Sequence, residues 1–166
     1  MSFAPNHDPN YFEEHSFLTN CGSFAFNIRE WYSPDDRFDE DDIELGNRLY
    51  EEDALSAEDI LKLLYDRDVA QILEDFKVKQ VTDKNISLNR NEELIAFRMC
   101  VNPYAPTEDE PLCIDYHFRV KRNGVWMEKI GCHEINKINN YSEDPWEISE
   151  ELVYTGPIAY FVKKCS

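Results

Sequence analysis

Apolar residues recur at helical spacing in the first half of the chain and alternate with polar residues in the second half. Within residues 16–32, the apolar residues from Cys21 onwards are three or four positions apart, which predicts a helix with one apolar face. The helix is expected to end before Pro34, because the residue that precedes a proline avoids the helical region. Residues 1–14 are rich in Pro and Asn and lack this periodicity, so they are expected to form an extended arm.

A second helical region is predicted between residues 55 and 76, as one helix or as two helices with a break near Asp66. Ser56 is a good cap for its start, because acidic residues follow in the first turn. The preceding residues 35–53 are mostly acidic with a few apolar positions. They predict an acidic insertion, either a loop with helical turns or a short helix.

The second half of the chain has the pattern of a β-sheet. Strands are predicted at residues 78–81, 94–101, 112–122, 125–130 and 157–162, the second of them central. Asn123-Gly124 is a strong signal for a two-residue hairpin turn between the third and fourth strands. A polar, Asn-rich loop is expected over residues 133–150. Helices first and an antiparallel sheet afterwards indicate an α+β fold, in a single domain spanning residues 1–166.

The chain is strongly acidic, with 17 Lys and Arg against 34 Asp and Glu and a net charge of -17. This charge opposes direct binding to nucleic acid or to an anionic membrane surface, since phosphate contacts need Lys and Arg. It suits a protein that mimics nucleic acid and occupies a basic groove on a partner. No stretch approaches about 18 consecutive apolar residues, so no membrane span is expected, and no secretory signal is recognised.

Five cysteines occur without the tight spacing of a metal site or a disulfide framework: Cys21, Cys100, Cys113, Cys132 and Cys165. Reduced thiols in a cytoplasm are the natural interpretation. Cys113 and His117 are four residues apart on a strand, about 13 Å, so they cannot share a metal directly. The sequence also has no glycine-rich phosphate loop. It therefore predicts no metal and no cofactor.

Cys21 is the candidate nucleophile. A thiolate at a helix start is stabilised by the helix dipole and by unpaired N–H groups, which lowers the pKa of such a thiol. The same N–H groups, including that of Cys21, can stabilise an oxyanion. Gly22 and Ser23 are expected to leave room for a substrate. The alternative is a cysteine buried in the core, since free cysteines are among the most buried residue types.

His117 is the candidate base, on the third predicted strand. With a two-residue turn at Asn123-Gly124, Arg119 faces Glu128 across the hairpin, and Glu128 lies diagonally from His117 on the same face. A carboxylate there could orient the imidazole and stabilise its charged form. A register shift of one residue would remove Glu128 from this face. The alternative is a surface pair of Arg119 with Glu128.

Three separated segments resemble the papain-like cysteine hydrolases, in particular their bacterial and phage members. They are similar to the nucleophile helix, the histidine hairpin and the closing strand of that superfamily, in the usual order. The residues that carry the resemblance are Asn20, Cys21, Ser23, Phe24, Ala25, Asp115, Tyr116, His117, Phe118, Gly124, Trp126, Lys129, Gly131 and the segment from Tyr154 to Cys165.

The resemblance implies a papain-like fold, with N-terminal helices packed on an antiparallel sheet. It also implies attack of Cys21 on an amide or ester, with His117 as the base. Glu128 stands where relatives often carry a histidine or an amide residue as the third catalytic group. The alternatives from the following loop are Asn139, Asn140 and Asp144.

Oxyanion support is expected from Asn20 or from His15. His15 stands six residues before Cys21, where papain-type enzymes place a glutamine. The expected function is therefore hydrolysis of a peptide or protein amide, with the acidic run at 35–53 favouring basic substrates or partners. The alternative is a non-catalytic, phage-encoded acidic protein that keeps the scaffold and blocks the basic groove of a host nucleic-acid enzyme.

Overall fold

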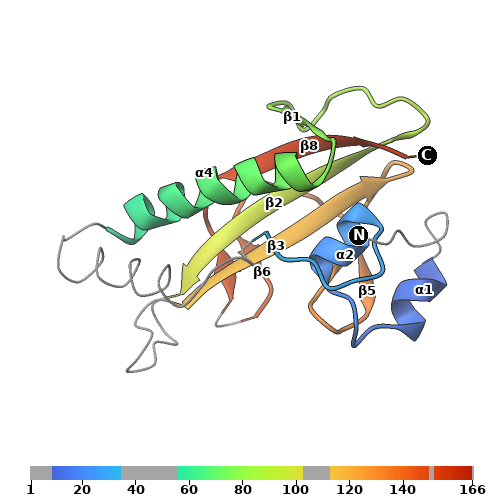
Figure 1. Ribbon diagram of the computed structural model, residues 1–166, viewed down its shortest axis with the longest axis horizontal. Helices are drawn as coiled ribbons and strands as arrows, with labels where there is room; N and C mark the ends of the chain where they lie inside the picture. Colours follow the sequence, from blue (N-terminus) through green and yellow to red (C-terminus); the bar gives the residue numbers. More distant parts are fainter. Residues whose placement is uncertain (1–8, 35–55, 103–112, 150–151, 166) are drawn as a thin grey trace.

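The computed structural model describes residues 9–34, 56–102, 113–149 and 152–165 (Figure 1). Its elements, in chain order, are α1 (Pro9–Glu14), α2 (Cys21–Phe26), α4 (Ala57–Asp75), β1 (Lys79–Val81), β2 (Glu92–Asn102), β3 (Cys113–Arg122), β4 (Val125–Lys129), β5 (Ile135–Ile138), β6 (Trp146–Glu147), β7 (Val153–Tyr154) and β8 (Ile158–Lys164).

The strands form a large antiparallel sheet in the order β1-β8-β2-β3-β4-β5, with β6 and β7 as a separate antiparallel pair. The predicted α+β class, with helices before an antiparallel sheet and β2 near its centre, is confirmed. Strands β5 and β6 lie within residues 133–150, where only a loop was expected. Each has four residues or fewer, too short to show a clear alternation.

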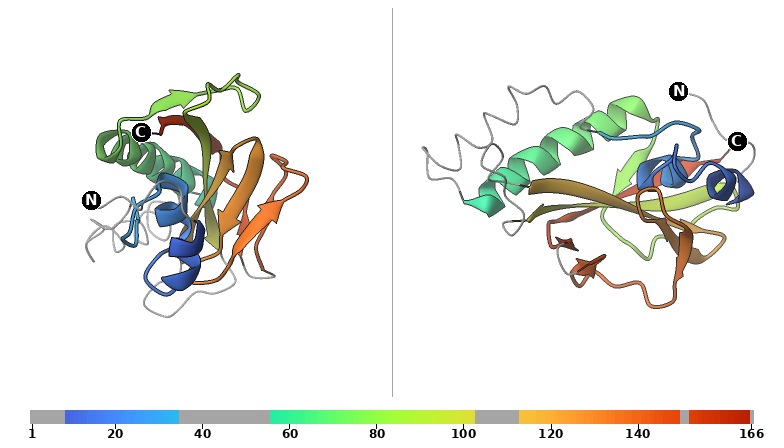
Figure 2. Two further views of the ribbon diagram at one scale, coloured as in Figure 1. Left: turned by 90° about the vertical axis from the view of Figure 1, so that its right-hand side faces the viewer. Right: turned by 90° about the horizontal axis from the view of Figure 1, so that it is seen from below.

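The sheet is covered on both faces. Figure 2 shows the helices on one side of it and the short strands β6 and β7 on the other. Along β2 the side chains alternate between the two layers, as strand geometry requires. Ile95 and Phe97 join the core beneath the helices, whereas Leu94 and Ala96 join a second core with Trp146.

The β3–β4 hairpin has the predicted register. Arg119 lies opposite Glu128, and Arg122 lies opposite Val125. Asn123 and Gly124 both have positive φ, 53° and 76°, the conformation that a two-residue hairpin turn requires. The prediction that His117 and Glu128 share a face of the sheet is therefore confirmed.

The helices differ from the sequence-based expectation in two places, and the structure decides between the one or two helices predicted over residues 55–76. Residues 9–14 form α1 rather than an extended arm, because Phe12 is buried against Phe24. The helix expected over 16–32 is the six-residue α2, which ends where Asn27 adopts a left-handed conformation. Helix α4 is continuous, without a break near Asp66.

Ser56 caps α4 as predicted, in a reciprocal pair of bonds with Asp59. The expected acidic insertion at 35–53 and residues 1–8 lie outside the described residues. Within the part of the chain that the structure describes, no helix is both long and apolar enough to cross a membrane.

Candidate active site

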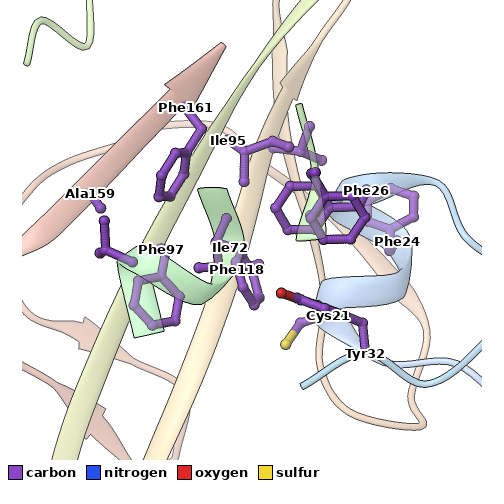
Figure 3. Close-up of a cluster of buried hydrophobic side chains, with 14 of the residues drawn as sticks. Cys21, Phe24, Phe26, Tyr32, Ile72, Ile95, Phe97, Phe118, Ala159 and Phe161 are labelled. Atoms are coloured by element: carbon purple, nitrogen blue, oxygen red, sulfur yellow. The ribbon is translucent and has the colours of Figure 1, made fainter. Parts of the chain in front are cut away.

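Helix α2 begins at Cys21 because Asn20 caps it. The Asn20 side chain accepts from the Ser23 N–H at 2.9 Å, and the Ser23 hydroxyl accepts from the Asn20 N–H at 3.1 Å. This reciprocal capping satisfies donors that a helix start leaves unpaired. Figure 3 shows Cys21 at the start of the helix and at the border of the core cluster that includes Phe26 and Tyr32.

The Asn20 amide also connects α2 to two distant segments. Its Nδ2 donates to the Tyr32 carbonyl at 2.6 Å and to the Tyr116 hydroxyl at 3.0 Å, and its Oδ1 accepts from the Tyr32 N–H at 3.2 Å. Both amide hydrogens are thus donated within the protein. The oxyanion role predicted for Asn20 would require exchanging one of these bonds for a bond to substrate.

The space at Gly22 is filled by the protein itself. A Cβ at this position would lie 2.9 Å from both Cδ1 and the carbonyl oxygen of Tyr32, and Gly22 and Ser23 are buried. These two residues were expected to leave room for a substrate. Instead, their small size lets the Tyr32 segment pack directly against α2.

Two cations hold the other end of α2. Arg122 donates from Nη2 to the Phe24 carbonyl at 3.1 Å, and Lys163 donates to the Phe26 carbonyl at 2.7 Å. Positive charge is favourable at a helix C-terminus, where carbonyl groups lack partners. Arg122 is also paired with buried Glu93. Together with the Asn20 cap, these contacts fix both ends of the short helix that carries Cys21.

His117 is held by a carboxylate and covered by aromatic rings. Its Nε2 donates to Glu128 Oε2 at 2.8 Å, and the same oxygen accepts from Arg119 Nε at 2.8 Å. The rings of Trp146 and Tyr154 lie 6.1 Å and 5.6 Å from the imidazole. Trp146 also lies 4.3 Å from the Arg119 guanidinium. Sequence reasoning missed Trp146, because nothing in the loop pattern links it to the hairpin.

The structure brings Cys21 to His117. The β3–β4 pairing ends at Arg119 and Glu128, so β4 no longer accompanies β3 beside His117, and α2 contacts both strands there. Burial disfavours protonation of His117, but hydrogen bonds to Cys21 and to Glu128 outweigh it and raise the pKa of His117 to about 9. Because Nε2 is bonded to Glu128, Nδ1 is the ring nitrogen left for the thiol.

All three side chains are shielded from solvent. The exposed fraction is 5% for Cys21, 3% for His117 and 8% for Glu128. Burial raises the pKa of the Glu128 carboxyl, but its bonds to His117 and Arg119 lower it more, so the net shift is downward. In such a setting charge interactions are stronger than at the surface. The arrangement is a buried thiol, imidazole and carboxylate in one chain of contacts.

The raised pKa of His117 predicts a pH-dependent stability. Between the ordinary histidine pKa of 6.5 and about 9, the folded protein binds a proton on His117 that the unfolded chain has released. The contribution of this proton to the free energy of unfolding is therefore complete below about pH 6.5 and lost as pH rises through about 9. It is on the order of 3 kcal/mol. In Glu128→Gln, which keeps an acceptor without the charge, the pKa of His117 in the folded protein should be lower, so urea unfolding should show a smaller decline that is complete at a lower pH. Identical pH profiles in the two proteins would contradict this coupling.

The other predicted site residues lie elsewhere. The Nδ1 of half-buried His15 donates to the Tyr11 carbonyl at 2.8 Å, and its ring stacks on Tyr11 with centroids 4.3 Å apart. This leaves Nε2 of His15 as the atom for the predicted oxyanion contact. The alternatives to Glu128 are exposed: Asn139, Asn140 and Asp144.

Within the described ranges, no group of three or more His, Cys, Asp and Glu side chains could hold a metal ion. A cavity of about 520 Å³ lies apart from the site, and neither Cys21 nor His117 lines it. Its walls include Arg98, Glu143 and Tyr160.

No family model, curated protein or solved structure matches this chain. The resemblance to papain-like hydrolases thus stands on the residues named from the sequence. Beside it stands the geometry of Cys21, His117 and Glu128, which is independent of any likeness to another protein.

Proposed function

We propose that this protein is a papain-like cysteine hydrolase that cleaves an amide bond in a peptide or protein. The observation that carries the proposal is the chain of contacts from Cys21 through the His117 ring to Glu128. A thiol, a base within reach and a group that orients the base are the three parts of an activated nucleophile. In this chain they come from α2, β3 and β4.

The reaction follows from the placement of these groups. His117 takes the proton of Cys21, and Sγ forms a bond to the amide carbonyl carbon, whose π electrons move to oxygen. When the carbonyl re-forms, the C–N bond breaks and His117 gives its proton to the departing nitrogen. Water then loses a proton to His117 and attacks the thioester. The C–S bond breaks, which releases the acid and restores Cys21.

The pKa of His117 suits both proton transfers. Hydrogen bonds to Cys21 and Glu128 outweigh burial and raise the pKa of His117, so a proton taken from Cys21 is stabilised on the ring. The resulting imidazolium is a donor close to the bond that breaks. Glu128 holds the ring so that one nitrogen faces the thiol, and its charge stabilises the imidazolium.

The test is the reactivity of each cysteine towards iodoacetamide, measured by mass spectrometry from about pH 5 to about pH 10. We expect Cys21 to be alkylated faster than Cys132 at and below neutral pH, although Cys132 is the more exposed. Half-buried Cys165 is an internal reference, because burial raises the pKa of its thiol to about 11. Exposure alone therefore predicts faster labelling of Cys132, whereas thiolate character predicts faster labelling of Cys21.

Labelling that follows exposure alone, with Cys132 ahead of Cys21 at every pH, would contradict the proposal. That outcome would leave the non-catalytic alternative, a scaffold with a buried cysteine. The net charge of -17 suggested this alternative, and the acidic run at 35–53 lies outside the described residues. The contacts between Cys21 and His117 favour the hydrolase.

A further inference from the structure

Lys129 is a fully buried lysine at the end of β4, directly after Glu128. Its Nζ lies 2.9 Å from the Ser16 carbonyl, 2.8 Å from the Thr19 carbonyl and 2.7 Å from the Gly131 carbonyl. Three acceptors require three hydrogens, and only the charged ammonium form of lysine has three. The protein therefore keeps a positive charge at a position with no exposed surface.

A buried lysine is ordinarily paired with a carboxylate, because an uncompensated charge is costly. Within the residues that the structure describes, the ion pairs of the site join Glu128 to His117 and Arg119, and Lys129 takes part in none. Burial lowers the pKa of Lys129, and the thiols of Cys132 and Cys21 act in the opposite direction. Ionised forms of these two thiols would therefore favour the ammonium form of Lys129.

Adjacent residues of a strand point to opposite faces, so the end of β4 serves two sides of the sheet. Glu128 reaches His117 on one side. Lys129 holds the carbonyls of Ser16 and Thr19, in the segment that leads into Cys21, on the other side. Glu128 therefore positions the proposed base His117, and the adjacent Lys129 positions the segment that precedes Cys21.

We propose that Lys129 is a positioning residue of the nucleophile: its ammonium fixes the segment before Cys21 and stabilises the thiolate form of Cys21. The inference rests on the proposed function. A fixed charge of this kind would compensate for the small dipole of a six-residue helix. The titratable groups that act on Cys21 or on its partners are His117, Glu128, Lys129, Cys132 and Tyr154.

The test compares the pH dependence of Cys21 alkylation in the wild type, in Lys129→Met and in Lys137→Met. Lys137 is an exposed lysine of β5 and serves as the matched control. In Lys129→Met we expect the alkylation rate near neutral pH to fall at least about tenfold, with the half-maximal rate shifted upward by about one pH unit. Lys137→Met should keep the wild-type profile.

The outcomes separate this inference from the proposed function. If wild-type Cys21 is no more reactive than Cys132, the proposed function fails and the role of Lys129 fails with it. If wild-type Cys21 is reactive and Lys129→Met has the same pH dependence with only a lower melting temperature, Lys129 is purely structural and the hydrolase proposal stands.

A second measurement decides the matter should Lys129→Met not fold. The pKa of the Lys129 ammonium can be followed by the ¹³C chemical shift of its Cε in the wild type and in Cys21→Ser. Because coupling between two charges is reciprocal, removal of the thiolate should lower the pKa of Lys129. An unchanged pKa of Lys129 in Cys21→Ser would overturn the inference.

Discussion

Replacing His117 by glutamine is expected to lower the hydrolytic rate on the order of 10²- to 10⁴-fold, the usual contribution of a positioned acid–base group. The reason is that the variant has no group to take the Cys21 proton or to return it to the leaving nitrogen. The measurement is the appearance of new termini in a defined mixture of synthetic peptides, counted by mass spectrometry. Alkylation of Cys21 near neutral pH should fall in parallel.

His133→Gln is the matched control, because His133 is exposed in the turn after β4. It should leave both the hydrolytic rate and the alkylation rate at the wild-type level. Urea unfolding of the two variants checks that each is folded at the assay temperature. A folded His117→Gln protein that cleaves peptides as fast as the wild type would refute the assignment of His117 as acid and base.

Replacing Arg122 by methionine is expected to destabilise the protein by about 3–5 kcal/mol. The change removes the cation that forms an ion pair with the buried Glu93 carboxylate. It also frees the Phe24 carbonyl at the end of α2. The measurement is the free energy of unfolding from a urea titration at neutral pH.

Two further variants identify the cause of the loss. Arg122→Met combined with Glu93→Leu should recover most of the stability, since a buried pair can often be replaced by apolar residues at little cost. Arg90→Met, which alters an exposed arginine just before β2, should change stability only slightly. A loss in Arg122→Met no larger than that in Arg90→Met would show that the Arg122–Glu93 pair contributes little.

The β3–β4 hairpin was predictable because its register depends on local information. Asn123-Gly124 fixes the length of the turn, and the two-residue period of a strand then places Glu128 beside His117. The start of α2 was predictable for a similar reason, since Asn20 is a good cap. Local chemistry thus located the candidate nucleophile, the base and its carboxylate.

The end of α2 was not predictable from spacing. Apolar residues continue at helical intervals to Tyr32, but Asn27 turns the chain and lets the Tyr32 segment fold back onto the Asn20 side chain. Hydrophobic periodicity carries no information about this polar contact. The contacts of Lys129 are hidden in the same way, because two of its three acceptors are backbone carbonyls more than a hundred residues away.

The contacts around α2 have a consequence for the protein during its synthesis. A six-residue helix is too short to persist by itself in water. The groups that fix it, among them Tyr116, Arg122 and Lys129, are made about a hundred residues later. In a ribosome-bound chain, Cys21 therefore lacks these contacts until the hairpin emerges. The proposed site is assembled only when the whole domain has been made.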